Sequence, residues 1–134
     1  GNINELKKSE KIFLNKEIKK FVILNVSAAF HSKYMLEAQK ELSNDIENLK
    51  FKDKKIKIIS NYDANIYSDN KTIKKNLQNQ MANRVNWTQS IKKLEEIGEK
   101  KIIEMGPNKV LSGLIKRISV NFDISSINSI SDIK

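Results

Sequence analysis

His31 is the residue of this chain best suited to acid–base chemistry, because it is the only histidine among 134 residues and histidine exchanges a proton near neutral pH. It lies where the apolar run of residues 21–24 gives way to a helical pattern. A junction of strand and helix can hold a side chain at the mouth of a cleft. A single histidine is nevertheless more often a surface or capping residue, so the residues around it decide between these interpretations.

Three motifs follow one another along the chain, and the first contains this histidine. Residues 29–32 read Ala-Phe-His-Ser, and Met35 follows in the next predicted helix. Residues 80–81 read Gln-Met, and residues 85–87 read Val-Asn-Trp. Residues 104–114 read Glu-Met-Gly-Pro-Asn-Lys-Val-Leu-Ser-Gly-Leu. One of these motifs alone is weak, but the three together, in this order and at this spacing, are a strong signal.

The three motifs resemble those of the malonyl-CoA:acyl carrier protein transacylases, over most of residues 20–118. The resemblance implies an α/β fold: the C-terminal part of an acyltransferase α/β-hydrolase-like core, plus part of a ferredoxin-like small subdomain. It also implies that residues 1–26 are a remnant of that subdomain, residues 27–119 belong to the core, and residues 120–134 form a C-terminal tail. The chain starts at Gly1 without a methionine, so we expect a piece of a longer chain, and the resemblance implies that this piece begins midway through the inserted subdomain.

The function implied by the resemblance is transfer of malonyl from coenzyme A to acyl carrier protein through a serine ester, in fatty acid biosynthesis. His31 matches the residue that takes the serine proton and later deprotonates the carrier-protein thiol, so it is the expected general acid/base. Gln80 matches a position whose backbone carbonyl orients this imidazole; the alternative is an ordinary exposed helix residue. The expected substrate is a coenzyme A thioester, with no cofactor and no metal.

Phe30 is the expected substrate-binding residue. It matches a position where related acyltransferases carry a bulky ring that crowds a 2-methyl branch, which favours malonyl over methylmalonyl. A ring that is packed for stability only is equally compatible with the sequence.

The serine that this chemistry requires is not in the chain. No Gly-x-Ser-x-Gly segment occurs, and Ser112 lies inside a predicted helix without the first glycine of that motif. Neither Arg84 nor Arg117 matches the motif of the arginine that binds the malonyl carboxylate in the family. We therefore expect both missing groups in an N-terminal half of the same enzyme, which is then a partner of this chain, and we expect the present chain to be inactive alone.

Three positions depart from the family pattern. Ala29 stands where many members have proline, Arg84 replaces the proline before Val-x-Trp, and Asn108 replaces the second glycine of Gly-Pro-Gly-Lys. Asparagine adopts left-handed backbone more readily than most residues, so the turn at Asn108 can persist. None of the three changes touches the chemistry of His31 directly.

Composition leaves a second class of function open. The formal net charge of +9 and the pI of about 9.6 fit a non-catalytic, lysine-rich α/β module that binds nucleic acid or an acidic protein. Only two of the 25 basic residues are arginines, the side chain preferred for phosphate recognition, so we expect no nucleic-acid partner. In the leading interpretation, the basic surface suits an acidic carrier protein and the coenzyme A phosphates, with Lys33, Lys109 and residues 116–117 as candidates.

Other features narrow the class further. The chain has no cysteine and one histidine, which disfavours disulfides and a zinc site. The longest apolar run, residues 21–24, is far too short to span a membrane, and we expect a cytoplasmic protein without a membrane partner. A third interpretation, an acyltransferase domain of a polyketide synthase, differs only in the flanking sequence; the short segment after Ile118 favours a free-standing enzyme.

The elements that must position these residues follow from hydrophobic periodicity and from helix caps. We expect strands at residues 19–26, 56–60 and 101–105, a lysine-rich connection at 51–57 and a polar turn at 61–65. Residues 120–134 are expected to form an edge strand or to fray. The predicted helices cover residues 2–18 (with an Asn2–Glu5 capping box), 32–49, 69 or 70 to 81, and 87–97 before Gly98, and the last one follows the turn at 106–107 and carries residues 110–118.

Overall fold

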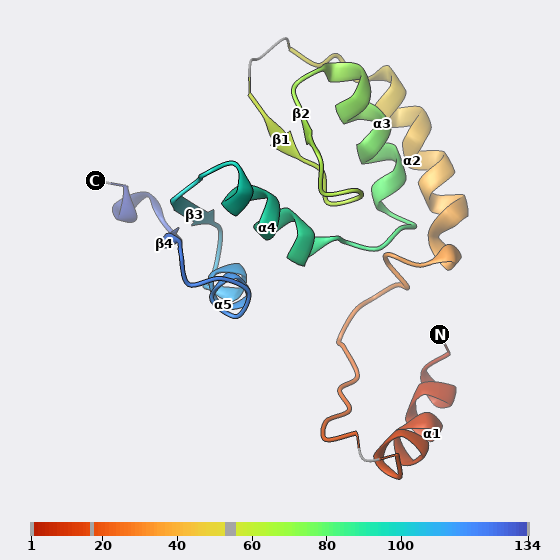
Figure 1. Cartoon of the computed structure of the whole chain (residues 1–134). Coiled ribbons are helices and arrows are strands. Elements are labelled where there is room, and N and C mark those ends of the chain that lie inside the picture. The colour runs from red at the N-terminus through yellow and green to blue at the C-terminus, as the bar shows by residue number, and fades with distance from the viewer. Residues whose placement is uncertain (1, 17, 53–55, 134) are drawn as a thin grey trace.

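The computed structural model describes residues 2–16, 18–52 and 56–133. Helices and short strands alternate along the chain (Figure 1). The elements are α1 (Ile3–Leu14), the 3-10 turn η1 (Lys33–Met35), α2 (Leu36–Asn48), β1 (Ile58–Ile59), β2 (Ile66–Tyr67), α3 (Asn70–Gln80), α4 (Trp87–Glu96), β3 (Lys101–Met105), α5 (Val110–Lys116), β4 (Asp123–Ile127) and the 3-10 turn η2 (Ile130–Asp132).

Helices α2 and α3 lie side by side and carry the region around His31 (Figure 1). Each has one apolar face, which buries Ile46 of α2 and Ile73 of α3. Asp69 caps α3 by accepting the Thr72 N–H at 2.7 Å, as an N-cap carboxylate does. The antiparallel pair β1–β2 joins Ile59 to Ile66 just before this helix.

The C-terminal part of the chain has its own small core. Strands β3 and β4 are parallel, with Lys101 opposite Asp123 and Met105 opposite Ile127. The core consists of Ile91, Ile115 and Phe122, and Trp87, Leu94, Ile102, Ile118 and Ile124 pack against it. One face of the strand pair therefore packs toward α4 and α5. The other face, which carries Ile103 and Met105, is open, and their side chains are 48% and 76% exposed.

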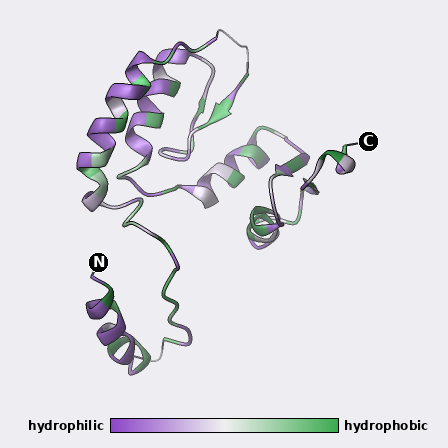
Figure 2. Ribbon diagram, turned by 180° about the vertical axis from the view of Figure 1, so that it is seen from behind, coloured by the Kyte–Doolittle hydropathy of each residue, from purple (hydrophilic) through white to green (hydrophobic). Residues whose placement is uncertain are grey.

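The predicted strand over residues 19–26 is wrong. The segment is apolar and extended, and in both views it lies with α1 away from the other elements (Figure 1, Figure 2). No described residue pairs with it as a strand, and Val22, Leu24 and Val26 are 58%, 71% and 64% exposed. A β-branched run becomes a strand only when another segment accepts its backbone hydrogen bonds, and the described part of this chain supplies none there.

The first helix is shorter than predicted, because it ends at Leu14 with Asn15 as its C-cap, a residue type whose side chain competes with helical hydrogen bonds. Asn2 caps the helix by accepting the Asn4 N–H at 2.9 Å. Glu5 pairs with Lys8 at 3.0 Å instead of closing the predicted capping box. The helix predicted from residue 32 begins as the turn η1 and becomes α-helical at Leu36.

Of the predicted C-terminal tail at 120–134, the described residues 120–133 do not fray as a whole, because β4 adds to β3 along five residue pairs. The strand predicted at 56–60 is only two residues long, and its partner β2 was not predicted. Residues 53–55 of the predicted lysine-rich connection lie outside the described residues. The predicted helices at α3, α4 and α5 and the predicted strand β3 are confirmed.

Candidate functional site

The end of α3 presents main-chain carbonyl groups to His31. The His31 backbone N–H donates to the Met81 carbonyl at 2.8 Å. Ring atom Nδ1 lies 3.0 Å from the Asn83 carbonyl oxygen and 3.2 Å from the Gln80 carbonyl oxygen. The last carbonyls of a helix lack intrahelical partners, so they are free to accept these bonds. His31 is thus held by both its backbone and its ring.

These contacts determine which ring nitrogen can act as a base. A carbonyl oxygen only accepts hydrogen bonds, so Nδ1 must carry the proton that it donates to Asn83 and Gln80. In the neutral ring, Nε2 then carries the lone pair and can accept a proton. His31 is an exposed residue.

His31 adopts a left-handed backbone conformation, with φ at 62°. A residue with a Cβ rarely has this conformation, and it is maintained where the surrounding contacts enforce it. Here the bond from the His31 N–H to Met81 and the bond from the Ser32 hydroxyl to the Ala29 carbonyl (2.7 Å) fix the turn on both sides. The strained turn directs the ring toward the end of α3.

An open hollow of about 390 Å³ lies beside the imidazole. We call it the His31 hollow. Its walls come from the His31 turn and from the facing sides of α2 and α3, and they are mainly apolar. The lining residues are Phe30, His31, Leu42, Ile46, Leu77, Gln80 and Met81. Phe30 is half exposed and forms part of this wall; its role in substrate binding stays a prediction.

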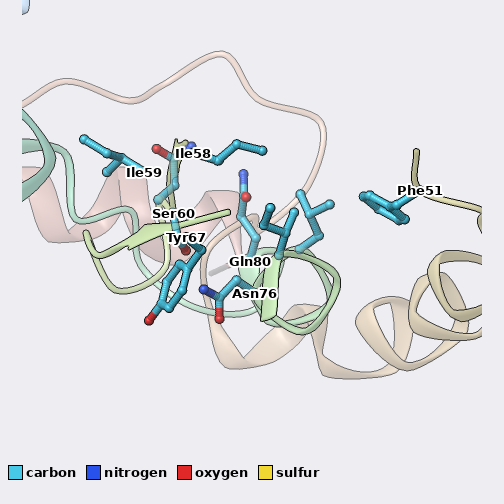
Figure 3. A pocket seen from close by; sticks show the side chains of 10 residues that line it. Phe51, Ile58, Ile59, Ser60, Tyr67, Asn76 and Gln80 are labelled. Carbon is cyan, nitrogen blue, oxygen red and sulfur yellow. The ribbon is translucent and has the colours of Figure 1, made fainter. Parts of the chain in front are cut away.

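A second hollow, of about 260 Å³, lies between the β1–β2 pair and α3 (Figure 3). Tyr67 is the titratable residue in its wall, and its hydroxyl donates to Asp63 at 2.7 Å. The hydrogen bond to Asp63 raises the pKa of Tyr67. A tyrosine held in its protonated form is a poor base, so acid–base chemistry is better placed in the His31 hollow.

Asn86 fixes the segment between Asn83 and the start of α4. Its backbone N–H donates to the Asn61 carbonyl at 2.8 Å, and its side-chain amide donates to the Tyr62 carbonyl. Asn86 also precedes the first residue of α4. The chain is therefore held at the start of α4, although Arg84 replaces the proline of the family pattern.

Glu104 anchors the third motif. It is 9% exposed on β3 and accepts the backbone N–H groups of Leu111 (2.9 Å) and Ser112 (2.8 Å), as well as the Ser112 hydroxyl. The Ser112 hydroxyl and these N–H groups lower the pKa of Glu104, although burial acts in the opposite direction. Ser112 is therefore a buried partner of Glu104 inside α5 and does not stand on an exposed turn as a nucleophile.

The other predicted residues lie at several places. Asn108 has φ at 75°, so the turn before α5 keeps a left-handed residue at this position. Lys33 begins η1, two residues after His31, and Lys109 precedes α5, while residues 116–117 end it. None of these basic residues is in the wall of the His31 hollow.

Sequence reasoning missed two of the contacts at this site. The Asn83 carbonyl was not predicted, because a main-chain contact leaves no trace in side-chain type. Glu104 carried a usable signal: it is the single acidic residue in the strand 101–105, and a helix starts six residues later, at Val110. A helix N-terminus attracts a carboxylate.

Among the described residues, no three His, Cys, Asp or Glu side chains come together as metal ligands would. Each helix in the described ranges is too short or too polar to cross a bilayer.

No family model matches the chain, but its fold is similar to that of the acyl carrier protein S-malonyltransferases. The structure of such an enzyme from Vibrio cholerae superposes with a TM-score of 0.85 at 30% sequence identity, over 98% of this chain and 43% of that one. The predicted fold class is thereby confirmed. The boundaries predicted at residues 26 and 119 stay predictions.

The sequence is also similar to curated proteins that include malonyl CoA-acyl carrier protein transacylases. The malonyl CoA-acyl carrier protein transacylase of Staphylococcus aureus is 35% identical over 116 residues, which are 87% of this chain and 38% of that protein. The polyketide biosynthesis protein PksE of Bacillus subtilis is 43% identical over 119 residues, 88% of this chain and 15% of that protein. The predicted resemblance to the transacylases is confirmed, and the chain spans less than half the length of these relatives.

Proposed function

We propose that this chain is the C-terminal part of an acyltransferase that moves malonyl from coenzyme A to acyl carrier protein. The observation that carries the proposal is the state of His31: its Nδ1 is bonded to carbonyl groups, which leaves the Nε2 lone pair available, and the residue lines an open hollow. The similarity to malonyl transacylases supplies the reaction class. Malonyl-CoA and an acyl carrier protein are the proposed substrates.

In this proposal His31 carries a proton twice. A serine hydroxyl attacks the thioester carbonyl of malonyl-CoA while Nε2 takes the hydroxyl proton, and the imidazolium then gives that proton to the departing coenzyme A thiolate. In the second half, Nε2 takes the proton of the carrier-protein thiol, which attacks the serine ester. The imidazolium returns the proton to the serine oxygen. The carbonyls of Gln80 and Asn83 accept the Nδ1–H bond throughout.

The serine comes from another part of the polypeptide in this proposal. Ser112 is excluded by its burial and its bond to Glu104. The relatives extend well beyond the part that this chain matches, and an N-terminal half that supplies the serine is consistent with this coverage. Residues 1–134 alone are then inactive. We refer below to the complete polypeptide that contains this chain as the full-length protein.

Phe30 is the proposed size filter for the acyl group, since its ring lines the His31 hollow and is half exposed. The basic side chains Lys33, Lys109 and residues 116–117 are proposed to attract the acidic carrier protein, because opposite charge speeds encounter.

The test is the rate of malonyl transfer from malonyl-CoA to acyl carrier protein by the full-length protein. His31→Ala is expected to lower this rate about a hundredfold or more, since it removes the proton carrier. Added imidazole should restore part of the lost rate, because it can occupy the space of the missing ring. The matched control, Thr88→Ala on the exposed side of α4, should leave the rate unchanged.

A loss of much less than a hundredfold in His31→Ala would remove His31 from the mechanism. Equal losses in His31→Ala and Thr88→Ala would show that the defect is in folding. The similarity to transacylases favours this function over the nucleic-acid module.

A further inference from the structure

Polar contacts join α2 to α3 and to the turn that follows α3, and three of them repeat every four residues along both segments. Because the helices run in opposite directions, the contacts form a ladder along their interface. Its rungs are Lys74 Nζ to the Glu47 carbonyl (2.7 Å), Gln78 Nε2 to the Ser43 carbonyl (3.1 Å), and the Ala82 N–H to Gln39 Oε1 (2.8 Å).

The third rung differs from the other two, because it lies beyond the last residue of α3. Ala82 is in the turn that follows the helix, and it is 8% exposed. Its backbone N–H donates to the side-chain oxygen of Gln39, which reaches across from α2. A buried N–H without an acceptor is costly, so the bond to Gln39 stabilises this turn.

The same turn holds the imidazole. Ala82 stands between Met81, whose carbonyl accepts the His31 backbone N–H, and Asn83, whose carbonyl accepts from Nδ1. Peptide units are planar and rigid, so fixing the Ala82 N–H also fixes the direction of the Met81 carbonyl in the same unit. The Asn83 carbonyl belongs to the peptide unit two further along the chain, so the same anchor restrains it less directly than the Met81 carbonyl.

We propose that Gln39 is a positioning residue for His31. Gln39 Oε1 fixes the Ala82 peptide, this peptide directs the Met81 and Asn83 carbonyls, and those carbonyls fix the backbone and the Nδ1–H tautomer of His31. Gln39 itself does not touch the reacting atoms. Its catalytic consequence rests on the proposed function, but its effect on the imidazole does not.

The test uses three variants of the full-length protein. Gln39→Leu removes the acceptor at similar size. Gln39→Glu keeps an oxygen that can accept the Ala82 N–H. Gln78→Leu, the matched control, removes the middle rung, which lies inside α3 and bonds to Ser43 and Glu47 rather than to the turn.

The first readout is the tautomer of His31, measured by nitrogen-15 NMR of the imidazole and assigned by its loss in His31→Ala. The wild type and Gln39→Glu are expected to show a proton on Nδ1 in the neutral ring. Gln39→Leu is expected to show a mixture of both tautomers, and Gln78→Leu should match the wild type. A wild-type spectrum in Gln39→Leu, or the same change in Gln39→Leu and Gln78→Leu, would overturn the proposal.

The second readout is malonyl transfer. Gln39→Leu should lower kcat by about ten- to a hundredfold, because a misplaced base is costly, and it should change KM by no more than about twofold. Gln39→Glu should recover most of kcat. Equal losses of kcat in Gln39→Leu and Gln39→Glu would overturn the positioning role. If the wild type transfers no malonyl while the NMR result is as expected, the proposed function fails and the positioning of His31 by Gln39 stands.

Discussion

At the scale of the residue, His31 is oriented by main-chain carbonyls of Gln80 and Asn83. A carbonyl holds the Nδ1 proton without bringing a second charge into the site, and it leaves Nε2 as the base. The bonds to Nδ1 come from the main chain, so they depend on the path of the chain at the end of α3 and in the turn after it. The side chains of Gln80 and Asn83 do not take part in them. Substitutions of the Gln80 side chain are therefore expected to be tolerated better than changes that move the turn.

Glu104 in the third motif is also held by backbone groups. Its carboxylate accepts two backbone N–H groups and the Ser112 hydroxyl, and these bonds lower its pKa below the ordinary value of 4.5. A carboxyl whose pKa is lower in the folded state stabilises the fold above the pKa of the unfolded chain. That stabilisation is lost as the pH falls through the folded-state pKa.

We therefore expect Glu104→Gln to lower the melting temperature of the full-length protein at pH 7. The difference in melting temperature between the variant and the wild type should narrow as the pH falls below about 4.5, because the wild-type carboxylate then becomes protonated and neutral, like the glutamine. Thermal unfolding followed by circular dichroism from pH 7 to pH 3 measures this. Glu99→Gln, at an exposed position, is the matched control and should show no such difference. A difference in melting temperature that stays constant with pH would contradict the proposal that the ionised carboxylate of Glu104 stabilises the fold.

At the scale of the element, the helix ends are where the sequence determines local structure. Gly98 ends α4 with φ at 81°, and its N–H bonds to the Glu95 carbonyl at 3.0 Å. A Cβ at Gly98 would meet no atom within 4 Å, so only the backbone conformation makes glycine necessary there. Gly113 has the same open surroundings, but it lies within α5 without a positive φ.

Replacing Gly98 or Gly113 by alanine should change the free energy of unfolding in opposite directions. Gly98→Ala should lower the free energy of unfolding by about 1 kcal/mol, because alanine is strained in the left-handed region. Gly113→Ala should raise it by roughly 0.5–1 kcal/mol, because alanine favours the helix. Urea unfolding of the full-length protein measures both differences. A destabilised Gly113→Ala would show that another part of the polypeptide packs closely against α5.

Much of this element structure could be predicted, and the reasons for the exceptions are physical. The apolar spacing of α3 and α4, the Asp69 cap and the turn at Gly98 are local signals, and they placed these helices correctly. Strand pairing is non-local: the run at 19–26 has high β propensity but no strand partner within the described ranges, whereas 123–127 becomes a strand because β3 lies beside it.

In the candidate site, too, local motifs could be predicted from the sequence and non-local contacts could not. The motif at residues 29–32 singled out His31 and Phe30, and the family resemblance gave the Gln80 carbonyl. The contacts of Asn83 and Gln39 could not be predicted, because each depends on how the turn after α3 meets a segment more than 40 residues away in sequence.

At the scale of the whole molecule, the chain leaves large apolar surfaces open. The open face of β3 and the segment at 22–26 expose several apolar side chains by more than half their area, among them Met105 and Leu24. Parallel sheets are normally covered on both faces, and contiguous apolar surface is normally an interface. This agrees with the proposal that the serine comes from a part of the polypeptide that packs against residues 1–134.

The covalent intermediate tests the central proposal most directly. The full-length protein is mixed with malonyl-CoA, quenched early, and analysed by intact mass and by peptide mapping. We predict one malonyl adduct on a serine outside residues 1–134, formed about a hundredfold or more slowly in His31→Ala than in the wild type. An adduct on Ser112 or any other residue of this chain, or equal rates of adduct formation in the two proteins, would contradict the account.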